Sequence, residues 1–379
     1  MSSSSKKLLF LITEDWYFYS HRLSLAQAAR DAGFDVTVVT KIDKYRDKFR
    51  NLGFKFININ LDRKSKNPFK LIRIIKEICA VYSIEKPDIV HHIAIKPVIL
   101  GSIASVFCKV PCIVNSLTGL GFIFTSQKII VRFIKIIIVE PLLSLLFNRK
   151  NSWIIVQNVD DKKLLKALKI IKNKRTVLIK GSGVDIEKFK PYPENTGFPR
   201  IILASRMLRD KGIYEFVSAA KQLLNMKVNA VFVLVGDIDP GNPSSVSKEE
   251  ILDWCKDTGI EWMGYREDMS NIFRESHVVC LPSYREGLPK VLLEAAASGK
   301  PIVATDVPGC REIVREGENG FLVPPKNSYA LAEAIKLLIE DKSLRERMGL
   351  AGRRIVEEEL SDNIINTQTI ELYNNVINS

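Results

Sequence analysis

Short apolar runs alternate along this chain with segments of helical period, and the alternation occurs in two successive blocks. In the first block, the apolar runs at 8–13, 35–40, 54–59, 88–93, 112–117, 153–157 and 176–179 are expected to be strands. Amphipathic segments such as 23–32, 71–82 and 164–170 separate most of them. Strands that alternate with helices form a parallel sheet covered on both faces. The sequence therefore predicts an α/β, doubly wound domain.

The segment 191–200, PYPENTGFPR, interrupts this pattern and is predicted to be a linker. The pattern then resumes, with strands expected at 201–204, 231–235, 261–263, 278–281, 302–305 and 321–323 and helices at 214–224, 248–257, 269–276, 289–298 and 330–340. Because a chain of 379 residues is too long for a domain with one ordinary hydrophobic core, we expect two Rossmann-like domains in tandem, 1–190 and 191–362. A last helix, 363–379, is expected to cross back onto the first domain.

Charge is divided unevenly between the two blocks. Residues 1–190 carry 34 Lys and Arg against 15 Asp and Glu, a net charge of +19, whereas residues 191–379 carry 22 against 28, a net charge of −6. A composition biased toward Lys, Ile and Asn explains part of the excess. The functional interpretation is attraction to an anionic surface, either a membrane or a nucleic acid. The six cysteines form no CxxC pair, which indicates reduced thiols in a cytoplasmic protein.

No run of apolar residues is long enough to cross a bilayer, and the start of the chain is too short in apolar residues for a signal peptide. The nearest candidate is 128–147, KIIVRFIKIIIVEPLLSLLF, in which Lys128, Arg132 and Lys135 would form one basic stripe on a helix. Such a helix can lie in a membrane interface. A core helix with one solvated edge is the alternative.

Two carboxylates in the segment 282–299, PSYREGLPKVLLEAAASG, are the strongest indication of function. Glu286 is expected on a loop and Glu294 inside the helix that follows, with Pro289 in its first turn. The free amides of a helix N-terminus can hold a phosphate. Because carboxylates repel an anion, these two are expected to bind sugar hydroxyls instead.

Two cations follow the strand at 201–204, namely Arg206 and Lys211. Ligands of open α/β sheets bind at the carboxyl ends of strands, so both cations are expected to reach one diphosphate. An Arg fork and a Lys charge suit a leaving group that gains negative charge. A solvated basic turn is the alternative for these two residues alone.

The segments 205–212, 282–314 and 319–325 resemble the donor domain of the retaining glycosyltransferases of family 4, and the similarity covers essentially the whole chain. The resemblance implies the GT-B fold, in which two Rossmann-like domains face a cleft. It assigns Glu286 to the hydroxyls of the donor sugar and Glu294 to the nucleotide ribose. The remaining donor-site residues that it implies are Gly287 and Leu288, whose amides would hold the diphosphate beside Arg206 and Lys211, then Tyr265 and Arg266 beside the base, and Gly236.

The loop at 14–22 resembles the acceptor-side loop of bacterial enzymes that extend sugars linked to undecaprenyl diphosphate, as do 86–97 and 115–124. The resemblance is best to N-acetylgalactosaminyltransferase-like enzymes, which add an N-acetylhexosamine or a related hexose. Cationic side chains there suit a diphosphate, and aromatic ones can stack on a sugar, contact lipid or belong to the core. One of His91 and His92 is expected to face the core and the other the cleft. The acceptor-binding residues implied are Trp16, Tyr17, His21, Arg22, Lys96, Thr118 and Gly119.

Some relatives carry a histidine after the strand at 112–117, where this chain has Thr118-Gly119-Leu120-Gly121. This substitution fits a retaining, front-face displacement in which the leaving phosphate helps to deprotonate the acceptor, with Glu286, Arg206 and Lys211 supplying position and charge. The nearest approach to an Asp-x-Asp metal motif is Asp237-Ile238-Asp239, in a turn rich in Gly and Pro. We therefore expect no essential metal and no other cofactor.

The sequence as a whole predicts a cytoplasmic glycosyltransferase, peripheral on the inner face of the plasma membrane. It would use a nucleotide sugar, expected to be UDP-linked, and a lipid-linked saccharide acceptor. A sugar-nucleotide epimerase or a hydrolase with paired carboxylates is the alternative on the same fold. A non-catalytic protein that binds nucleic acid is suggested only by the basic half of the chain.

Overall fold

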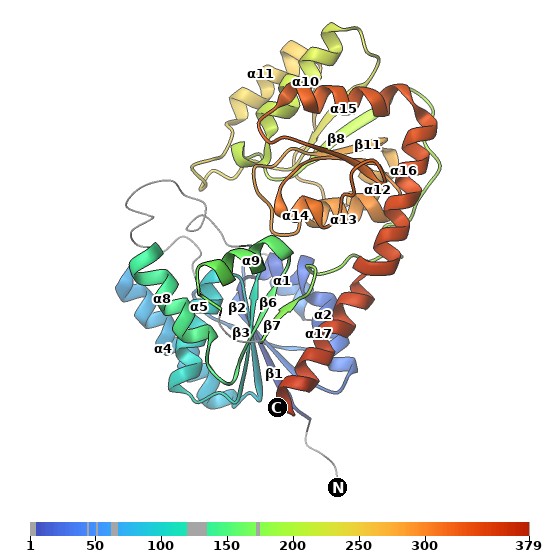
Figure 1. Cartoon of the computed structure of the whole chain (residues 1–379). Coiled ribbons are helices and arrows are strands. Elements are labelled where there is room, and N and C mark those ends of the chain that lie inside the picture. The colour runs from blue at the N-terminus through green and yellow to red at the C-terminus, as the bar shows by residue number, and fades with distance from the viewer. Residues whose placement is uncertain are drawn as a thin grey trace. The chain divides into compact units, whose positions relative to one another are not determined.

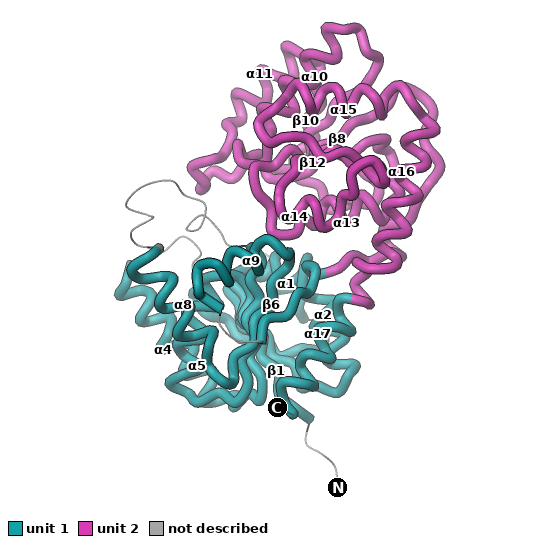
Figure 2. The backbone as a smooth tube through the Cα atoms, in the orientation of Figure 1, with its two compact units in different colours: residues 1–182, 365–379 teal, residues 183–364 magenta. Residues whose placement is uncertain are grey.

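The computed structural model describes residues 5–43, 45–50, 52–61, 67–119, 135–171 and 175–378. It divides into two compact units, Met1–Ser182 with Ile365–Ser379 and Gly183–Ile364 (Figure 2). The segment 191–200, expected to be a linker, belongs to unit 2, because Glu194 forms a buried ion pair with Arg345 at 2.8 Å. The boundary between the units therefore precedes this segment.

Unit 1 contains a seven-stranded parallel sheet in the order β3-β2-β1-β4-β5-β6-β7 (Figure 1). Central strands such as β4 are buried along their whole length, as expected for a sheet covered on both faces. The strands are β1 (Lys7–Glu14), β2 (Asp35–Lys41), β3 (Lys55–Asn58), β4 (Ile89–Ile93), β5 (Cys112–Leu117), β6 (Ser152–Val156) and β7 (Thr176–Leu178). The helices are α1 (Asp15–His21), α2 (Leu23–Asp31), α3 (Arg46–Phe49), α4 (Pro68–Glu85), α5 (Ile95–Phe107), the π-helical turn η1 (Lys135–Val139), α8 (Glu140–Phe147), α9 (Val159–Ala167) and α17 (Asp362–Ile377).

The last helix, α17, packs on unit 1 as predicted, although it follows unit 2 in the chain. Its buried face carries Leu372, Tyr373 and Val376. The ring of Tyr373 packs edge-on against Phe34, with 5.9 Å between ring centroids. The helix thereby completes the core on one face of the unit 1 sheet.

Unit 2 contains a six-stranded parallel sheet in the order β10-β9-β8-β11-β12-β13. Its strands are β8 (Arg200–Ala204), β9 (Val231–Val235), β10 (Glu261–Trp262), β11 (Val278–Leu281), β12 (Ile302–Thr305) and β13 (Gly320–Val323). Its helical elements are the 3₁₀ turn η2 (Arg209–Lys211), α10 (Ile213–Asn225), α11 (Lys248–Thr258), α12 (Met269–Glu275), α13 (Lys290–Ala297), α14 (Pro308–Arg311), α15 (Ser328–Glu340), α16 (Lys342–Ile355) and the π-helical turn η3 (Val356–Leu360). Two doubly wound parallel sheets confirm the predicted fold class.

The predicted basic stripe of the segment 128–147 cannot be located, because Lys128, Arg132 and the side chain of Lys135 lie outside the described residues. The described part of this segment is helical, and it exposes Ile137 and Leu145 by 66% and 69%. Among the helices that the structure describes, none is both long and apolar enough to cross a membrane.

Candidate active site

The topological switch point of unit 2 lies between β8 and β11, which are neighbours at the centre of the sheet. From β8 the strand order runs outward through β9 to β10, and from β11 it runs outward in the opposite direction through β12 to β13. In doubly wound sheets, ligands bind beyond the carboxyl ends of the strands at this point. The loop after β8 carries Lys211 and the loop after β11 carries Glu286. The fold therefore places the two predicted loops next to each other.

Lys211 and Glu286 form a close ion pair at this point, with 2.5 Å between Nζ and Oε1. Their side chains are 23% and 10% exposed, so the pair is largely shielded from water. Partial burial strengthens the attraction and keeps both groups in defined positions. The sequence predicted that both residues line the site but not that they contact each other.

A glycine allows the two loops to approach this closely. Gly212 has φ +73°, and a Cβ there would lie 2.1 Å from the carbonyl oxygen of Pro282. The backbone amide of Tyr284 also donates to the carbonyl of Asp210 at 2.9 Å. These contacts fix the backbone beside Lys211 against the start of the loop that carries Glu286.

The loop that carries Glu286 is held from its other side by α14. A Cβ at Gly309 would lie 2.6 Å from the carbonyl oxygen of Gly287, so only glycine permits this contact without displacement. The hydroxyl of Thr305, at the end of β12, donates to the carbonyl of Ser283. Gly309 was not among the predicted site residues, since a glycine after the strand predicted at 302–305 carries no functional group that would mark it.

Glu294 lies within α13, which begins at Lys290 with Pro289 as its N-cap residue. The sequence predicted Pro289 inside the first turn of this helix, and the structure places it just before that turn. The Glu294 carboxylate is 14% exposed and lies 3.7 Å from the ammonium of Lys290. Burial raises the pKa of Glu294, and the positive charges of Lys290 and Lys188 partly oppose that rise. A buried carboxyl group with a raised pKa is suited to hydrogen bonding with hydroxyl groups.

Arg206 does not share a partner with Lys211 in the structure. Its guanidinium pairs with Asp239 at 2.8 Å, and the Arg206 side chain is 41% exposed. Asp237 caps its own turn, accepting from the amide of Ile238 at 2.8 Å. Both aspartates of the Asp-x-Asp sequence are thus engaged in local contacts of the turn.

Gly236 and the loop 264–266 form the wall beside β8. Gly236 has φ +129°, a Cβ there would lie 1.8 Å from the carbonyl oxygen of Ser205, and its amide donates to Gly264 at 2.7 Å. Tyr265 is 61% exposed and Arg266 forms an ion pair with Asp268 at 2.6 Å. The close approach of the Ser205 backbone therefore explains why position 236 is a glycine, whether or not this residue also contacts a ligand.

Tyr284, which sequence analysis did not single out, extends the site toward α10. Its hydroxyl donates to Glu215 at 2.8 Å, and burial together with this bond raises the pKa of Tyr284. The ammonium of Lys326 lies 4.9 Å from the centroid of its ring. Tyr284 was not predicted as a site residue, because the segment 282–299 was interpreted through Glu286 and Glu294.

The predicted acceptor-side loop of unit 1 is a short helix, α1, which corrects the expectation of an irregular loop. Asp15, the first residue of this helix, is held in place because its buried carboxylate accepts from the backbone amides of Asp43 at 2.6 Å and Tyr45 at 3.0 Å. Trp16 is 37% exposed, and the ring of Tyr17 stacks on His21 at 4.3 Å between centroids. These three side chains therefore gather on one short helix after β1.

Arg22 lies apart from that group and is only 4% exposed. Its guanidinium donates to the carbonyl of Gly181 at 3.4 Å. The structure thus places Arg22 in the interior of unit 1, beneath the surface where an acceptor was expected to meet it. Lys96 lies in the first turn of α5, and Thr118 and Gly119 follow β5, so these three predicted residues do lie at the carboxyl ends of strands.

His91 and His92 are both fully buried, which corrects the prediction that one of them faces a cleft. His91 bonds to the hydroxyls of Tyr373 at 2.6 Å and Ser116 at 2.5 Å. His92 bonds to Tyr82 at 2.9 Å on the other face of the sheet. Burial lowers the pKa of both, that of His92 to about 4, so both rings are neutral core groups.

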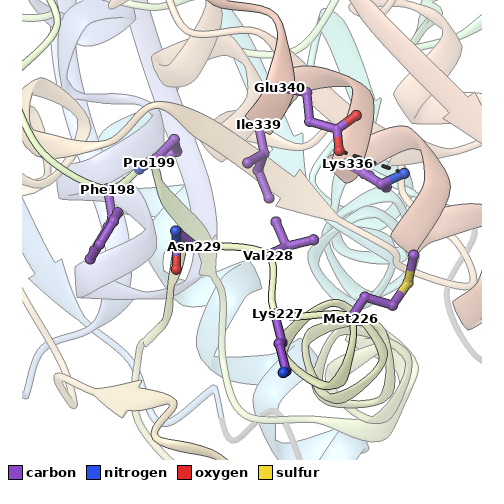
Figure 3. A pocket seen from close by; sticks show the side chains of 9 residues that line it. All are labelled: Phe198, Pro199, Met226, Lys227, Val228, Asn229, Lys336, Ile339 and Glu340. Carbon is purple, nitrogen blue, oxygen red and sulfur yellow. Dashed lines mark ion pairs between the residues drawn. The ribbon is translucent and has the colours of Figure 1, made fainter.

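A separate pocket of about 620 Å³ lies at the opposite, amino-terminal edge of the unit 2 sheet (Figure 3). Pro199 precedes β8 there, Lys227 precedes β9, and Lys336 and Glu340 reach it from α15. It is remote from the switch point and contains none of the predicted site residues. In the parts of the chain that the structure describes, no three His, Cys, Asp or Glu residues are grouped as metal ligands.

Comparisons with known proteins cover both units of the chain. The sequence profile described as "Glycosyl transferases group 1" matches residues 184–355, and that described as "Glycosyl transferase 4-like" matches residues 7–158. A Campylobacter jejuni N,N'-diacetylbacillosaminyl-diphospho-undecaprenol alpha-1,3-N-acetylgalactosaminyltransferase is 31% identical over 95% of this chain and 96% of its own. An Escherichia coli UDP-Gal:alpha-D-GlcNAc-diphosphoundecaprenol alpha-1,3-galactosyltransferase is 29% identical over 76% of this chain and 73% of its own.

Solved structures share the fold at lower identity. Anabaena Alr3699/HepE in complex with UDP and glucose superimposes with a TM-score of 0.79 at 20% identity, covering 98% of this chain and 100% of that one. A glycosyltransferase from Rickettsia africae gives a TM-score of 0.79 at 20% identity, with 99% of each chain covered. At this level of identity the likeness establishes the two-domain fold alone.

Proposed function

The chain belongs to the family 4 glycosyltransferases of GT-B fold, and we propose that it moves an N-acetylhexosamine or hexose from a UDP-linked donor to a polyprenyl-diphosphate-linked saccharide. The observation that carries the proposal is the shielded Lys211–Glu286 pair at the switch point of unit 2. It combines a cation for the diphosphate with a carboxylate for the sugar. The names of the relatives from C. jejuni and E. coli support a diphosphoundecaprenol-linked acceptor.

In the proposed donor complex, the diphosphate accepts from Lys211 and Arg206 and from the amides of Gly287 and Leu288. Both cations are paired with carboxylates in the structure, so binding exchanges one anionic partner for another. Glu286 then turns from Lys211 toward the sugar hydroxyls, while Glu294 binds the ribose. The base lies beside Tyr265 and Arg266, with Gly236 lining the same site.

The proposed reaction retains the anomeric configuration. The bond between the anomeric carbon and the diphosphate oxygen breaks, and the acceptor hydroxyl oxygen bonds to the carbon on the same face. The proton of that hydroxyl passes to the leaving diphosphate. Lys211 and Arg206 stabilise the charge that the diphosphate gains, and this fixed electrostatic contribution requires no metal.

We further propose that unit 1 binds the acceptor and holds the enzyme on the anionic inner face of the plasma membrane. Trp16, Tyr17 and His21 are gathered on α1, and Lys96, Thr118 and Gly119 lie at neighbouring strand ends. The net charge of +19 in residues 1–190 supports attraction to anionic lipid. In this proposal, Arg22 is a buried cation that lies beneath the surface that binds the acceptor.

The test is a panel of nucleotide sugars incubated with the purified protein and a short-chain polyprenyl-diphosphate saccharide. We expect transfer from a UDP-sugar, full activity in excess chelator, and a product with the anomeric configuration of the donor by NMR. Inverted product would refute retention, and rescue by Mg²⁺ or Mn²⁺ after chelation would refute metal independence. Rapid consumption of the nucleotide sugar without acceptor would instead establish a hydrolase or epimerase.

A further inference from the structure

A cationic depression lies at the amino-terminal edge of the unit 1 sheet, away from the strand ends that carry the predicted acceptor residues. It has a volume of about 620 Å³ and lies between the α5–β5 loop and the α8–β6 loop. Lys109 comes from the first loop, and Arg149 and Lys150 come from the second. Figure 1 shows α5 and α8 as neighbours on one face of the sheet.

The cations of this depression have no carboxylate partner among the residues that the structure describes. Within the described ranges, no ion pair involves Lys109, Arg149 or Lys150, and the Nε atom of Arg149 is buried without a hydrogen-bond acceptor. A buried donor left without an acceptor is unfavourable, so an incoming oxygen ligand would relieve it. The lining thus presents three positive charges and one unsatisfied donor.

The two loops around the depression are held in place by asparagine side chains. Asn151 donates to the carbonyl of Val110 at 2.9 Å, which links the α8–β6 loop to the α5–β5 loop. Asn148 donates to the carbonyl of Ile170 at 2.9 Å. The cations therefore project from a fixed framework and not from free loops.

Two large apolar side chains are exposed next to these cations. Phe107, two residues before Lys109, is 73% exposed, and Ile84, near the end of α4, is 75% exposed. The ends of α4 and α5 are adjacent, because the Ser83 hydroxyl lies 3.9 Å from the Cys108 thiol. Cations after helices also offset the negative end of the helix dipole, but that role does not account for exposed Phe107 and Ile84.

We propose that this edge of unit 1 binds the phosphate headgroup of an anionic phospholipid. Lys109, Arg149 and Lys150 would contact the phosphate, and Phe107 and Ile84 would enter the interfacial layer. Apolar side chains beside lysines are the chemistry of an interfacial membrane contact and favour lipid over nucleic acid. The inference rests on the proposed membrane association and adds a defined headgroup site to it.

The test measures co-sedimentation with vesicles of phosphatidylcholine, with and without phosphatidylglycerol. One variant changes Lys109, Arg149 and Lys150 to Gln. Its matched control changes Lys41, Arg46 and Arg50, which are exposed at the other end of the same sheet, so both lose three charges. We expect the first variant to bind phosphatidylglycerol vesicles roughly 100-fold more weakly and the control to stay within about threefold of the unchanged protein.

A second pair of variants tests the apolar contact, since Phe107→Ser and Ile84→Ser remove exposed side chains and should leave folding intact. Each is expected to weaken vesicle binding roughly tenfold. Transfer to a water-soluble acceptor and the thermal unfolding midpoint should not change in any of these variants.

Two results would overturn the headgroup site. These are equal losses in the two triple variants, or tighter retention on RNA than on vesicles. Failure of the unchanged protein to bind phosphatidylglycerol vesicles would instead refute the membrane part of the proposed function. Sugar transfer is measured separately and is independent of both outcomes.

Discussion

Replacing Gly212 by alanine tests how the two loops of the active site are joined. Gly212 has φ +73° and faces the carbonyl oxygen of Pro282, 2.1 Å from where a Cβ would lie. Gly259 has nearly the same φ, +72°, but nothing lies within 4 Å of its Cβ position. Alanine pays about 1–2 kcal/mol for this left-handed conformation at either position. At Gly212 the collision adds about 1–3 kcal/mol.

We therefore expect Gly259→Ala to lose about 1–2 kcal/mol of unfolding free energy and Gly212→Ala about 2–5 kcal/mol. For a unit of this size, each kcal/mol lowers the unfolding midpoint by about 2–4 °C. Thermal unfolding gives this comparison, and UDP titration adds a second one. Gly212→Ala should also weaken UDP binding because Lys211 precedes it, whereas Gly259→Ala should not. Equal destabilisation by both variants, or unchanged UDP affinity in Gly212→Ala, would refute the close approach as the cause.

Three further predictions follow from the same structure. Gly309→Ala should displace the loop that carries Glu286 and lower kcat about tenfold or more, with UDP binding less affected, as steady-state kinetics would show. Burial raises the pKa of Glu294, so the charge of its carboxylate opposes folding above that pKa. Glu294→Gln should therefore raise the thermal unfolding midpoint at pH 8, and this increase should disappear below about pH 4. The same variant should weaken UDP binding. His91 and His92 are neutral in the folded protein and take up protons on unfolding, because burial lowers the pKa of both. The free energy of unfolding should therefore fall by about 1.4 kcal/mol per pH unit for each histidine as the pH drops from about 6.5 toward 5. Urea titrations at several pH values measure this dependence, and His92→Gln should make it less steep.

Strand positions were predictable because both faces of each parallel strand are buried, which leaves continuous apolar runs such as Val278–Leu281. Helix α5 was not singled out, because its sequence is apolar on nearly all sides and shows little helical period. Helix α1 was missed for a different reason. Its first residue, Asp15, is held by the backbone amides of Asp43 and Tyr45, about thirty residues away, and no local pattern reveals these contacts.

The residues of the active site were predictable from strand ends and motif spacing, but their partners were not. The contact between Lys211 and Glu286 depends on β8 and β11 being neighbours, which no local pattern reveals. The same holds for His91, whose partner Tyr373 comes from the last helix of the chain. Loop contacts made through glycine, as at Gly309, leave no chemical signal in the sequence.

The central claim is that Glu286 orients the donor sugar while Lys211 holds the diphosphate, and Glu286→Gln tests it most directly. Its matched control is Glu340→Gln, which breaks an ion pair with Lys336 at 3.5 Å, at the opposite edge of the same sheet. The measurement is the transfer rate and the UDP affinity of each variant. We predict that Glu286→Gln lowers kcat by about 100-fold or more with UDP affinity within about threefold, and that Glu340→Gln changes neither. Full transfer activity in Glu286→Gln, or a loss of UDP affinity that matches the loss of transfer, would contradict the assignment.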